Sequence, residues 1–158
     1  MSLQFSPAGK PFLARRFDIE FNLSHCEDRG VIAIARCPVG IDLERLREVS
    51  DALAIAENLF TASENRALRA FPAPLQSEAF LRCWTRKEAY VKARGVGLVT
   101  PLASFEVTLD PSSPELELLQ ETGGLHWRLF ELQAGSGWVG ALAIEREPAR
   151  IVNRHFPG

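Results

Sequence analysis

The sequence lacks the signals of membrane insertion and secretion. No apolar run approaches the roughly 18 residues that a membrane-spanning helix requires. The first residues, Met1 to Pro7, contain no basic stretch followed by an apolar core, so they do not resemble a signal peptide. The three cysteines, Cys26, Cys37 and Cys83, form no C-x-x-C pair, which argues against a disulfide framework and a cysteine-based zinc site. We therefore expect a cytoplasmic protein with reduced thiols and no membrane partner.

The sequence also lacks a large excess of charge of either sign. Its 158 residues include 18 Lys and Arg against 20 Asp and Glu, which leaves a formal net charge of −2 at pH 7. This balance argues against a nucleic-acid partner. Repeats of short period and low-complexity segments are absent as well, and 46% of the residues are hydrophobic. The composition therefore predicts one globular domain rather than a fibrous or disordered chain.

What is present is a strand–helix–strand order of hydrophobic patterns. Apolar residues at 17, 19, 21 and 23 alternate with polar ones, which predicts a half-buried strand. Further strands are expected at 31–35, 39–44, 105–109, 125–129, 138–144 and 150–156, and helices at about 51–60, 61–71 and 77–94 with N-caps at Ser50, Thr61 and Ser77. This order predicts an α+β fold in which an antiparallel sheet packs on about three helices.

Two carboxylates are expected side by side on the strand at 39–44. Because residues i and i+2 share one face of a strand, Asp42 and Glu44 lie together while Ile41 and Leu43 face the core. Paired carboxylates raise each other's proton affinity, and a hard cation between them relieves that conflict. The alternative interpretation is a solvated polar face of an edge strand.

The helix predicted at 77–94 carries charged residues where its apolar stripe should continue. The stripe consists of Phe80, Cys83, Trp84 and Val91. Lys87 and Glu88 interrupt it, and Lys92 follows Glu88 by one turn. Glu88 is thus a candidate third metal ligand and Lys92 a candidate phosphate-facing cation. The alternative is an ordinary Glu88–Lys92 pair in solvent.

The same helix is locally basic. Between residues 77 and 97 it has five basic residues against two acidic ones: Arg82, Arg86, Lys87, Lys92 and Arg94. This segregation suggests an anionic ligand or an acidic protein partner, whereas a solvated helix face is the simpler interpretation.

A short polar segment, Asn22 to His25, ends the first long strand. Ser24 and His25 can bind phosphate through charge-assisted hydrogen bonds, although a strand-end histidine often has no such role. A Ser-His-Asp triad is a poor interpretation because no nucleophile elbow occurs, and His126 and His155 lie on strand-like segments.

Four segments in this order resemble a known family. They are Gly9–Phe12 (GKPF), Phe21–His25 (FNLSH), Gly40–Glu44 (GIDLE) and Trp84–Lys92 (WTRKEAYVK). They are similar to the signature of the 4′-phosphopantetheinyl transferases, in the larger, pseudodimeric type that activates carrier domains of surfactin synthetase and related enzymes. The resemblance spans about Gly9 to Gly97.

The resemblance implies an activity and a set of site residues. Such enzymes move the phosphopantetheine group of coenzyme A to a serine of an acyl or peptidyl carrier protein and release 3′,5′-ADP. The implied Mg²⁺ ligands are Asp42, Glu44 and Glu88, with Glu88 and Lys92 as catalytic residues. The implied substrate-binding residues are Lys10, Pro11, Ser24, His25 and Lys87.

The resemblance also implies two parts in the chain. Residues 1–38 match a remnant of an N-terminal half, and residues 39–158 match a complete C-terminal half that carries the metal site. A missing first segment should expose apolar surface, so we expect a homo-oligomer that covers it. Weak coenzyme A binding is a further hypothesis. Two alternatives stay open: a degenerate coenzyme A or carrier-protein binding module, and a Mg²⁺-dependent nuclease or phosphohydrolase.

Overall fold

The computed structural model describes residues 3–5, 9, 11–13, 18–95, 100–110, 115–117, 127–146 and 150–155. The elements in chain order are β1 (Leu3–Phe5), β2 (Pro11–Leu13), β3 (Glu20–Cys26), β4 (Arg29–Ala35), β5 (Val39–Arg45), α1 (Ala52–Leu59), α2 (Ala62–Ala70), α3 (Ala73–Arg94), a short 3-10 helix (Leu102–Ser104), β6 (Glu115–Glu117), β7 (Arg128–Glu131) and β8 (Trp138–Ile144). All strand pairs are antiparallel, which together with the three helices confirms the predicted α+β fold.

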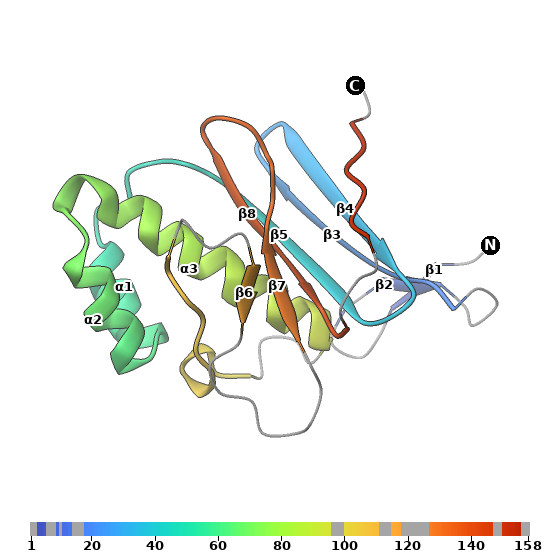
Figure 1. The fold of residues 1–158 in the computed structure, drawn as a ribbon, viewed down its shortest axis with the longest axis horizontal. Coiled ribbons are helices and arrows are strands. Elements are labelled where there is room, and N and C mark those ends of the chain that lie inside the picture. Colours follow the sequence, from blue (N-terminus) through green and yellow to red (C-terminus); the bar gives the residue numbers. More distant parts are fainter. Residues whose placement is uncertain are drawn as a thin grey trace.

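Helix α3 and a four-stranded sheet form the two main layers (Figure 1). The sheet has the order β5-β8-β7-β6, and α3 lies along β5 and β8 while α1 and α2 pack beside its first turns (Figure 1). A Cβ atom on Gly40 would lie 2.1 Å from the carbonyl oxygen of Ala89 and 2.3 Å from the amide nitrogen of Ala93. Only glycine fits this contact, so β5 is held directly against the helix that carries the candidate site residues.

The helices begin at slightly different residues from those expected. Thr61 forms the predicted capping box with Glu64. Helix α3, however, begins at Ala73 rather than after Ser77. Pro74 is compatible with the first turn, because the backbone N–H groups there have no acceptor within the helix and proline therefore loses no hydrogen bond. The Ser77 hydroxyl instead accepts a hydrogen bond from the Val49 N–H at 3.0 Å. Helix α1 likewise begins one residue after the expected start and has no side-chain cap at Asp51.

Phe105, Val107 and Leu109 are buried as their alternation suggests, but the segment at 105–109 belongs to no sheet of the described residues, so the strand expected there is wrong. Its backbone groups bond to side chains instead of a neighbouring strand. Glu64 accepts the Val107 N–H at 2.8 Å, Lys87 donates to the Phe105 carbonyl at 2.7 Å, and Arg86 donates to the Thr108 carbonyl. The predicted edge strand at the C-terminal end is also wrong over 150–155, where the chain is irregular and exposed.

Strands β3 and β4 form a separate two-stranded sheet whose buried face is the reverse of what the alternation suggests. Asn22 and Ser24 are buried, whereas the apolar residues Leu23, Ile32 and Ile34 are 48%, 67% and 71% exposed. The polar side of β3 faces β5, where its side chains find hydrogen-bond partners, whereas the apolar side is exposed at Leu23, Ile32 and Ile34. The expected division of the chain at residue 38 stays a prediction, although the four-stranded sheet does begin just after it.

Among the described residues, no helix has both the length and the apolar character that crossing a membrane requires.

Candidate metal-binding and catalytic site

The candidate site lies between β5 and α3, with β3 on its third side. Asp42 projects from β5 toward α3, and its side chain is only 8% exposed. The opposite face of β5 is covered by apolar residues of β4, so both faces of the strand are buried. Asp42 therefore does not belong to a solvated polar face, which was the alternative for this pair of carboxylates.

Asp42 accepts hydrogen bonds from two elements. The Lys92 ammonium group on α3 donates to Asp42 Oδ1 at 2.7 Å, and the Ser24 hydroxyl on β3 donates to the same oxygen at 3.0 Å. Burial raises the pKa of Asp42 above its ordinary value and the nearby Glu44 adds to this, although Lys92 and Ser24 act in the opposite direction. The sequence-predicted residues Ser24, Asp42 and Lys92 thus meet at one carboxylate oxygen.

Glu44 lies at the more open end of the site. Its Oε2 atom is 2.9 Å from Arg47 Nη1 and 3.7 Å from the Cys26 thiol sulfur, and its side chain is 23% exposed. Sequence reasoning did not assign a role to Arg47 or Cys26. The signal for Cys26 was its position on β3 two residues after Ser24, which places both side chains on the same face.

Glu88 is half-buried on α3, and its carboxyl group makes no hydrogen bond or ion pair with any residue that the structure describes. Burial raises its pKa above the ordinary glutamate value, and the charges of Asp42 and Glu44 raise it further, while Lys92 lowers it. The expected alternative, a Glu88–Lys92 surface pair, does not form within the described part of the chain, because the Lys92 ammonium group turns to Asp42.

The donor chemistry of this site fits a hard divalent cation. Asp42 Oδ2 is buried without a hydrogen-bond partner among the described residues, and the pKa values of Asp42 and Glu88 are both raised. Carboxylate oxygens are the ligands that Mg²⁺ prefers. Within the described ranges no three acidic, histidine or cysteine side chains stand close enough together to hold a metal as a set. Lys92 here supplies the positive charge next to Asp42.

Lys87 was expected to bind substrate, and its position contradicts this. Its side chain is fully buried on the far side of α3, where its ammonium group lies 2.8 Å from Glu64 Oε1. It also donates to the carbonyl oxygens of Leu102 and Phe105 at 2.7 Å each. The three N–H donors of this ammonium group are all used by acceptors inside the protein and none is exposed, so Lys87 does not contact a bound phosphate.

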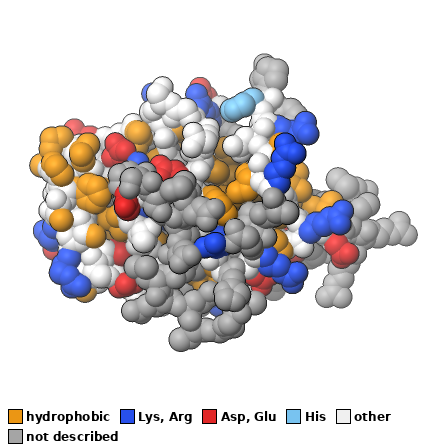
Figure 2. Space-filling model, viewed as in Figure 1, with side chains coloured by type: hydrophobic (Ala, Val, Ile, Leu, Met, Phe, Trp, Pro, Cys, Tyr) orange, Lys and Arg blue, Asp and Glu red, His pale blue; other side chains and the backbone are white. Residues whose placement is uncertain are grey.

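The basic face expected on α3 is wrong for the same reason. Arg82 and Arg86 are buried, and both donate to the Glu131 carboxylate on β7 at 3.3 Å. Only Arg94 of the five basic side chains is exposed. On the face drawn in Figure 2, Lys and Arg side chains are spread over the surface, on the right, which is the strand side in Figure 1, as well as at the left end and the top. Because most of its basic side chains are buried, α3 does not present the basic surface that was expected to attract an acidic partner.

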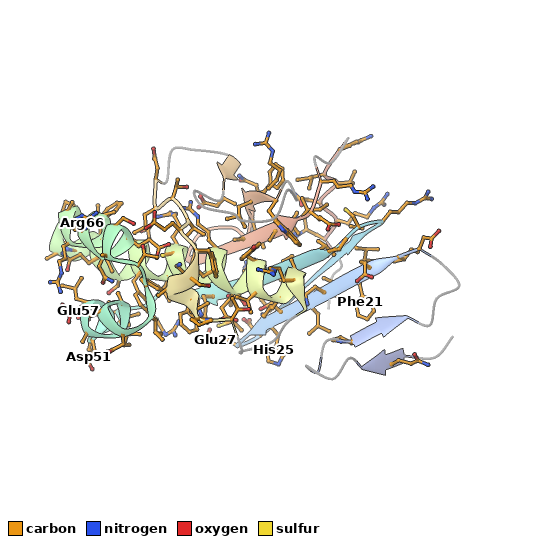
Figure 3. All side chains as sticks on the ribbon, turned by 90° about the horizontal axis from the view of Figure 1, so that it is seen from below. Phe21, His25, Glu27, Asp51, Glu57 and Arg66 are labelled. Carbon is orange, nitrogen blue, oxygen red and sulfur yellow. The ribbon has the colours of Figure 1, made fainter. Side chains whose placement is uncertain are left out.

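The remaining predicted residues lie around the site without entering it. His25 is exposed and projects from the same side of β3 as Phe21, away from α3, whereas Ser24 points the other way (Figure 3). Pro11 begins β2 and is half-buried. Lys10 lies outside the described residues, as does His126, and His155 is exposed in the irregular C-terminal segment.

Comparison with known proteins places this architecture in a family. The family described as the 4′-phosphopantetheinyl transferase superfamily matches residues 38–143, which is more than half of the chain. The chain is 36% identical over 148 residues to the 4′-phosphopantetheinyl transferase HetI of Nostoc, covering 91% of this chain and 60% of that protein. It is 32% identical over 128 residues to the 4′-phosphopantetheinyl transferase Sfp of Bacillus subtilis, covering 80% of this chain and 56% of that protein.

A solved structure shares the fold. The holo-(acyl-carrier-protein) synthase of Bacillus anthracis, in complex with coenzyme A (3′,5′-ADP), superposes with a TM-score of 0.56 at 22% identity, covering 68% of this chain and 94% of that one. The α+β fold agrees with the family match over residues 38–143, and the chain belongs to the 4′-phosphopantetheinyl transferase superfamily. It spans between 39% and 60% of the length of three curated relatives.

Proposed function

We propose that the protein transfers the 4′-phosphopantetheine group of coenzyme A to a serine of an acyl or peptidyl carrier protein, with Mg²⁺, and releases 3′,5′-ADP. The observation that carries this proposal is the cluster at β5 and α3, where Lys92 binds Asp42 and the half-buried Glu88 lies within reach of both their charges. The names of the curated relatives, which are 4′-phosphopantetheinyl transferases, support the same reaction.

In this reaction the carrier-protein serine attacks the β-phosphorus of the coenzyme A pyrophosphate. The bond from that phosphorus to the bridging oxygen breaks, and 3′,5′-ADP leaves with the negative charge. Glu88 accepts the serine proton as general base, directly or through water. Lys92, which is 30% exposed, stabilises the charge on the departing phosphate.

Asp42, Glu44 and Glu88, which do not form a closed ligand set in this structure, would have to converge to hold the Mg²⁺ ion. When bound, that ion would neutralise the pyrophosphate and polarise its phosphorus. Ser24 acts from the buried side by donating a hydrogen bond to Asp42 Oδ1. A contact of His25 with a coenzyme A phosphate stays a prediction from the family resemblance. Contacts of Lys10 and Pro11 with coenzyme A stay predictions from the family resemblance.

The test is transfer by the purified chain in the presence of coenzyme A, Mg²⁺ and an apo carrier domain, followed by the mass of the carrier. The wild type should add one phosphopantetheine group, and Asp42→Asn and Glu88→Gln should lose transfer while remaining folded. Asp51→Asn is the matched control, because Asp51 is an exposed carboxylate on the far helical end (Figure 3). Full activity in both site variants would contradict the proposal.

Two other outcomes of this assay correspond to other functions. Binding of coenzyme A or carrier without transfer would support a binding module. Mg²⁺-dependent cleavage of a nucleic acid that Glu88→Gln abolishes would support a nuclease instead.

We also propose that a second copy of the chain covers the exposed side of the β3–β4 sheet. Leu23, Ile32 and Ile34 lie together on that side, since Leu23 pairs with Ile32 across the strands. Burial of such a patch removes apolar area from water. Light scattering at micromolar concentration should show an oligomer that Ile34→Lys dissociates, whereas a strictly monomeric wild type would contradict this proposal.

A further inference from the structure

Strand β5 is the edge of the four-stranded sheet, so one side of its backbone has no strand ladder. Its partner β8 lies on the other side, and antiparallel pairing directs alternate peptide groups away from that partner. The N–H groups of Ile41 and Leu43 point outward in this way, and both residues are buried. Buried N–H groups at an edge need acceptors from elsewhere.

Strand β3 provides these acceptors with side chains rather than with its backbone. The Ile41 N–H donates to the carboxamide oxygen of Asn22 at 2.9 Å, and the Leu43 N–H donates to the Ser24 hydroxyl at 3.3 Å. Asn22 and Ser24 are only 5% and 7% exposed and project from the same side of β3. The two tethered residues, Ile41 and Leu43, flank Asp42, the residue on which the candidate site depends.

From this arrangement we infer that Asn22 is a positioning residue: by accepting the Ile41 N–H, it fixes the backbone beside Asp42 and thereby the orientation of the Asp42 carboxylate. The inference rests on the proposed function only for its catalytic consequence. Ser24 tethers the other flank and donates directly to Asp42 Oδ1, so it has a contact of its own with the carboxylate. Asn22 is linked to β5 through a backbone group, since its carboxamide oxygen accepts the Ile41 N–H. Loss of its acceptor frees one flank of Asp42 and leaves Lys92 and Ser24 to orient it.

The experiment compares Asn22→Ala with Asn58→Ala in the full chain. Asn58 is the matched control, because its carboxamide also bonds a backbone group, the Ala54 carbonyl at 2.8 Å, but on the exposed face of α1. Amide hydrogen exchange resolved by residue should speed up about tenfold or more at Ile41 in Asn22→Ala, since a buried N–H loses its acceptor. Exchange at Asp42, whose N–H points to β8, should change much less.

The functional readout is the Mg²⁺ concentration that gives half-maximal transfer. It should rise several-fold in Asn22→Ala, with a smaller change in the KM for coenzyme A, because the carboxylate rather than the coenzyme A contacts is displaced. Unchanged exchange at Ile41, or equal acceleration of every β5 amide, would overturn the inference, since the latter marks general destabilisation. A wild type without transfer would count against the proposed function, and the exchange result at Ile41 would then decide the role of Asn22 by itself.

Discussion

Replacement of Lys87 by methionine tests whether this lysine contacts substrate, as the family resemblance implied, or holds the fold. Its side chain has no exposure, and its ammonium group bonds Glu64, which is itself 2% exposed, together with the carbonyl oxygens of Leu102 and Phe105. Methionine keeps most of the side-chain volume. It leaves the Glu64 charge and two carbonyl oxygens without the ammonium group.

The expected loss follows from the contacts that remain. Removal of one partner of a buried ion pair costs about 3–5 kcal/mol. Glu64 keeps hydrogen bonds from the N–H groups of Thr61 and Val107, so we expect the lower end, about 3 kcal/mol. A domain has a total stability of about 5–15 kcal/mol, so this is a large fraction. Urea denaturation at pH 7 measures the change in the free energy of unfolding.

A second variant keeps the test decisive if Lys87→Met unfolds. Glu64→Gln combined with Lys87→Met removes both charges, so the double variant should be more stable than Lys87→Met alone. A Lys87→Met protein with unchanged free energy of unfolding and a raised KM for coenzyme A would refute the structural role and restore substrate binding.

Three further predictions concern the site and its support. The raised pKa of Glu88 should make its carboxyl group titrate above the ordinary value of 4.5 in the metal-free chain, as followed by NMR, and titration at or below 4.5 would contradict the burial of this group. Because folding raises the pKa of Glu88, this group stabilises the folded state below about pH 4.5, and that contribution is lost as the pH rises through the pKa of the folded state. At pH 7 the buried charge is therefore unfavourable, so Glu88→Gln should raise the urea midpoint while transfer is lost. Gly40→Ala, whose Cβ would lie 2.1 Å from the Ala89 oxygen, should lower stability by about 1–3 kcal/mol or more, and an unchanged melting temperature would show that the helix can move aside. Maleimide modification of Cys26, 3.7 Å from Glu44, should raise the Mg²⁺ requirement, and unaltered metal dependence after complete labelling would separate this thiol from the site.

Local patterns were sufficient for the existence of the three helices and for strands β3, β4, β5 and β8, whereas β6 was not expected and β7 was expected at 125–129 instead of Arg128–Glu131. The capping box at Thr61 and the glycine that ends α3 at Gly95, with φ of 65°, are local features that depend on a few neighbouring residues. The same holds for the hairpin of β3 and β4, whose turn and β-branched run are contiguous.

Alternation did not show which side of β3 is buried. The apolar side suggested a core-facing strand, but the hydrogen-bond acceptors of Asn22 and Ser24 are needed at the edge of β5, nineteen positions further along the chain in each case. A period of two reports that the two sides of a strand differ, whereas the neighbour that covers each side is a property of the assembled layers.

Charge patterns along α3 were misleading in a related way. The sequence pattern suggests that Lys87 and Arg86 are surface charges on a basic helix. Their carbonyl and carboxylate partners, however, lie between 15 and 45 positions away along the chain, with Glu64 on the N-terminal side and the others on the C-terminal side. Such a buried cation is stable only with acceptors from several elements, and no window of local sequence contains them.

By itself the sequence determined the fold class and the residue types of the site, because strand and helix periods and the carboxylates of GIDLE and WTRKEAYVK are written along the chain. Only the tertiary structure decided which charged side chains belong to the candidate site and which stabilise the fold. Lys92 and Lys87 lie five residues apart on one helix, but one reaches Asp42 at the open side while the other is enclosed with Glu64. The physical reason is that burial and distant partners, rather than residue type, set the free energy of a charged group.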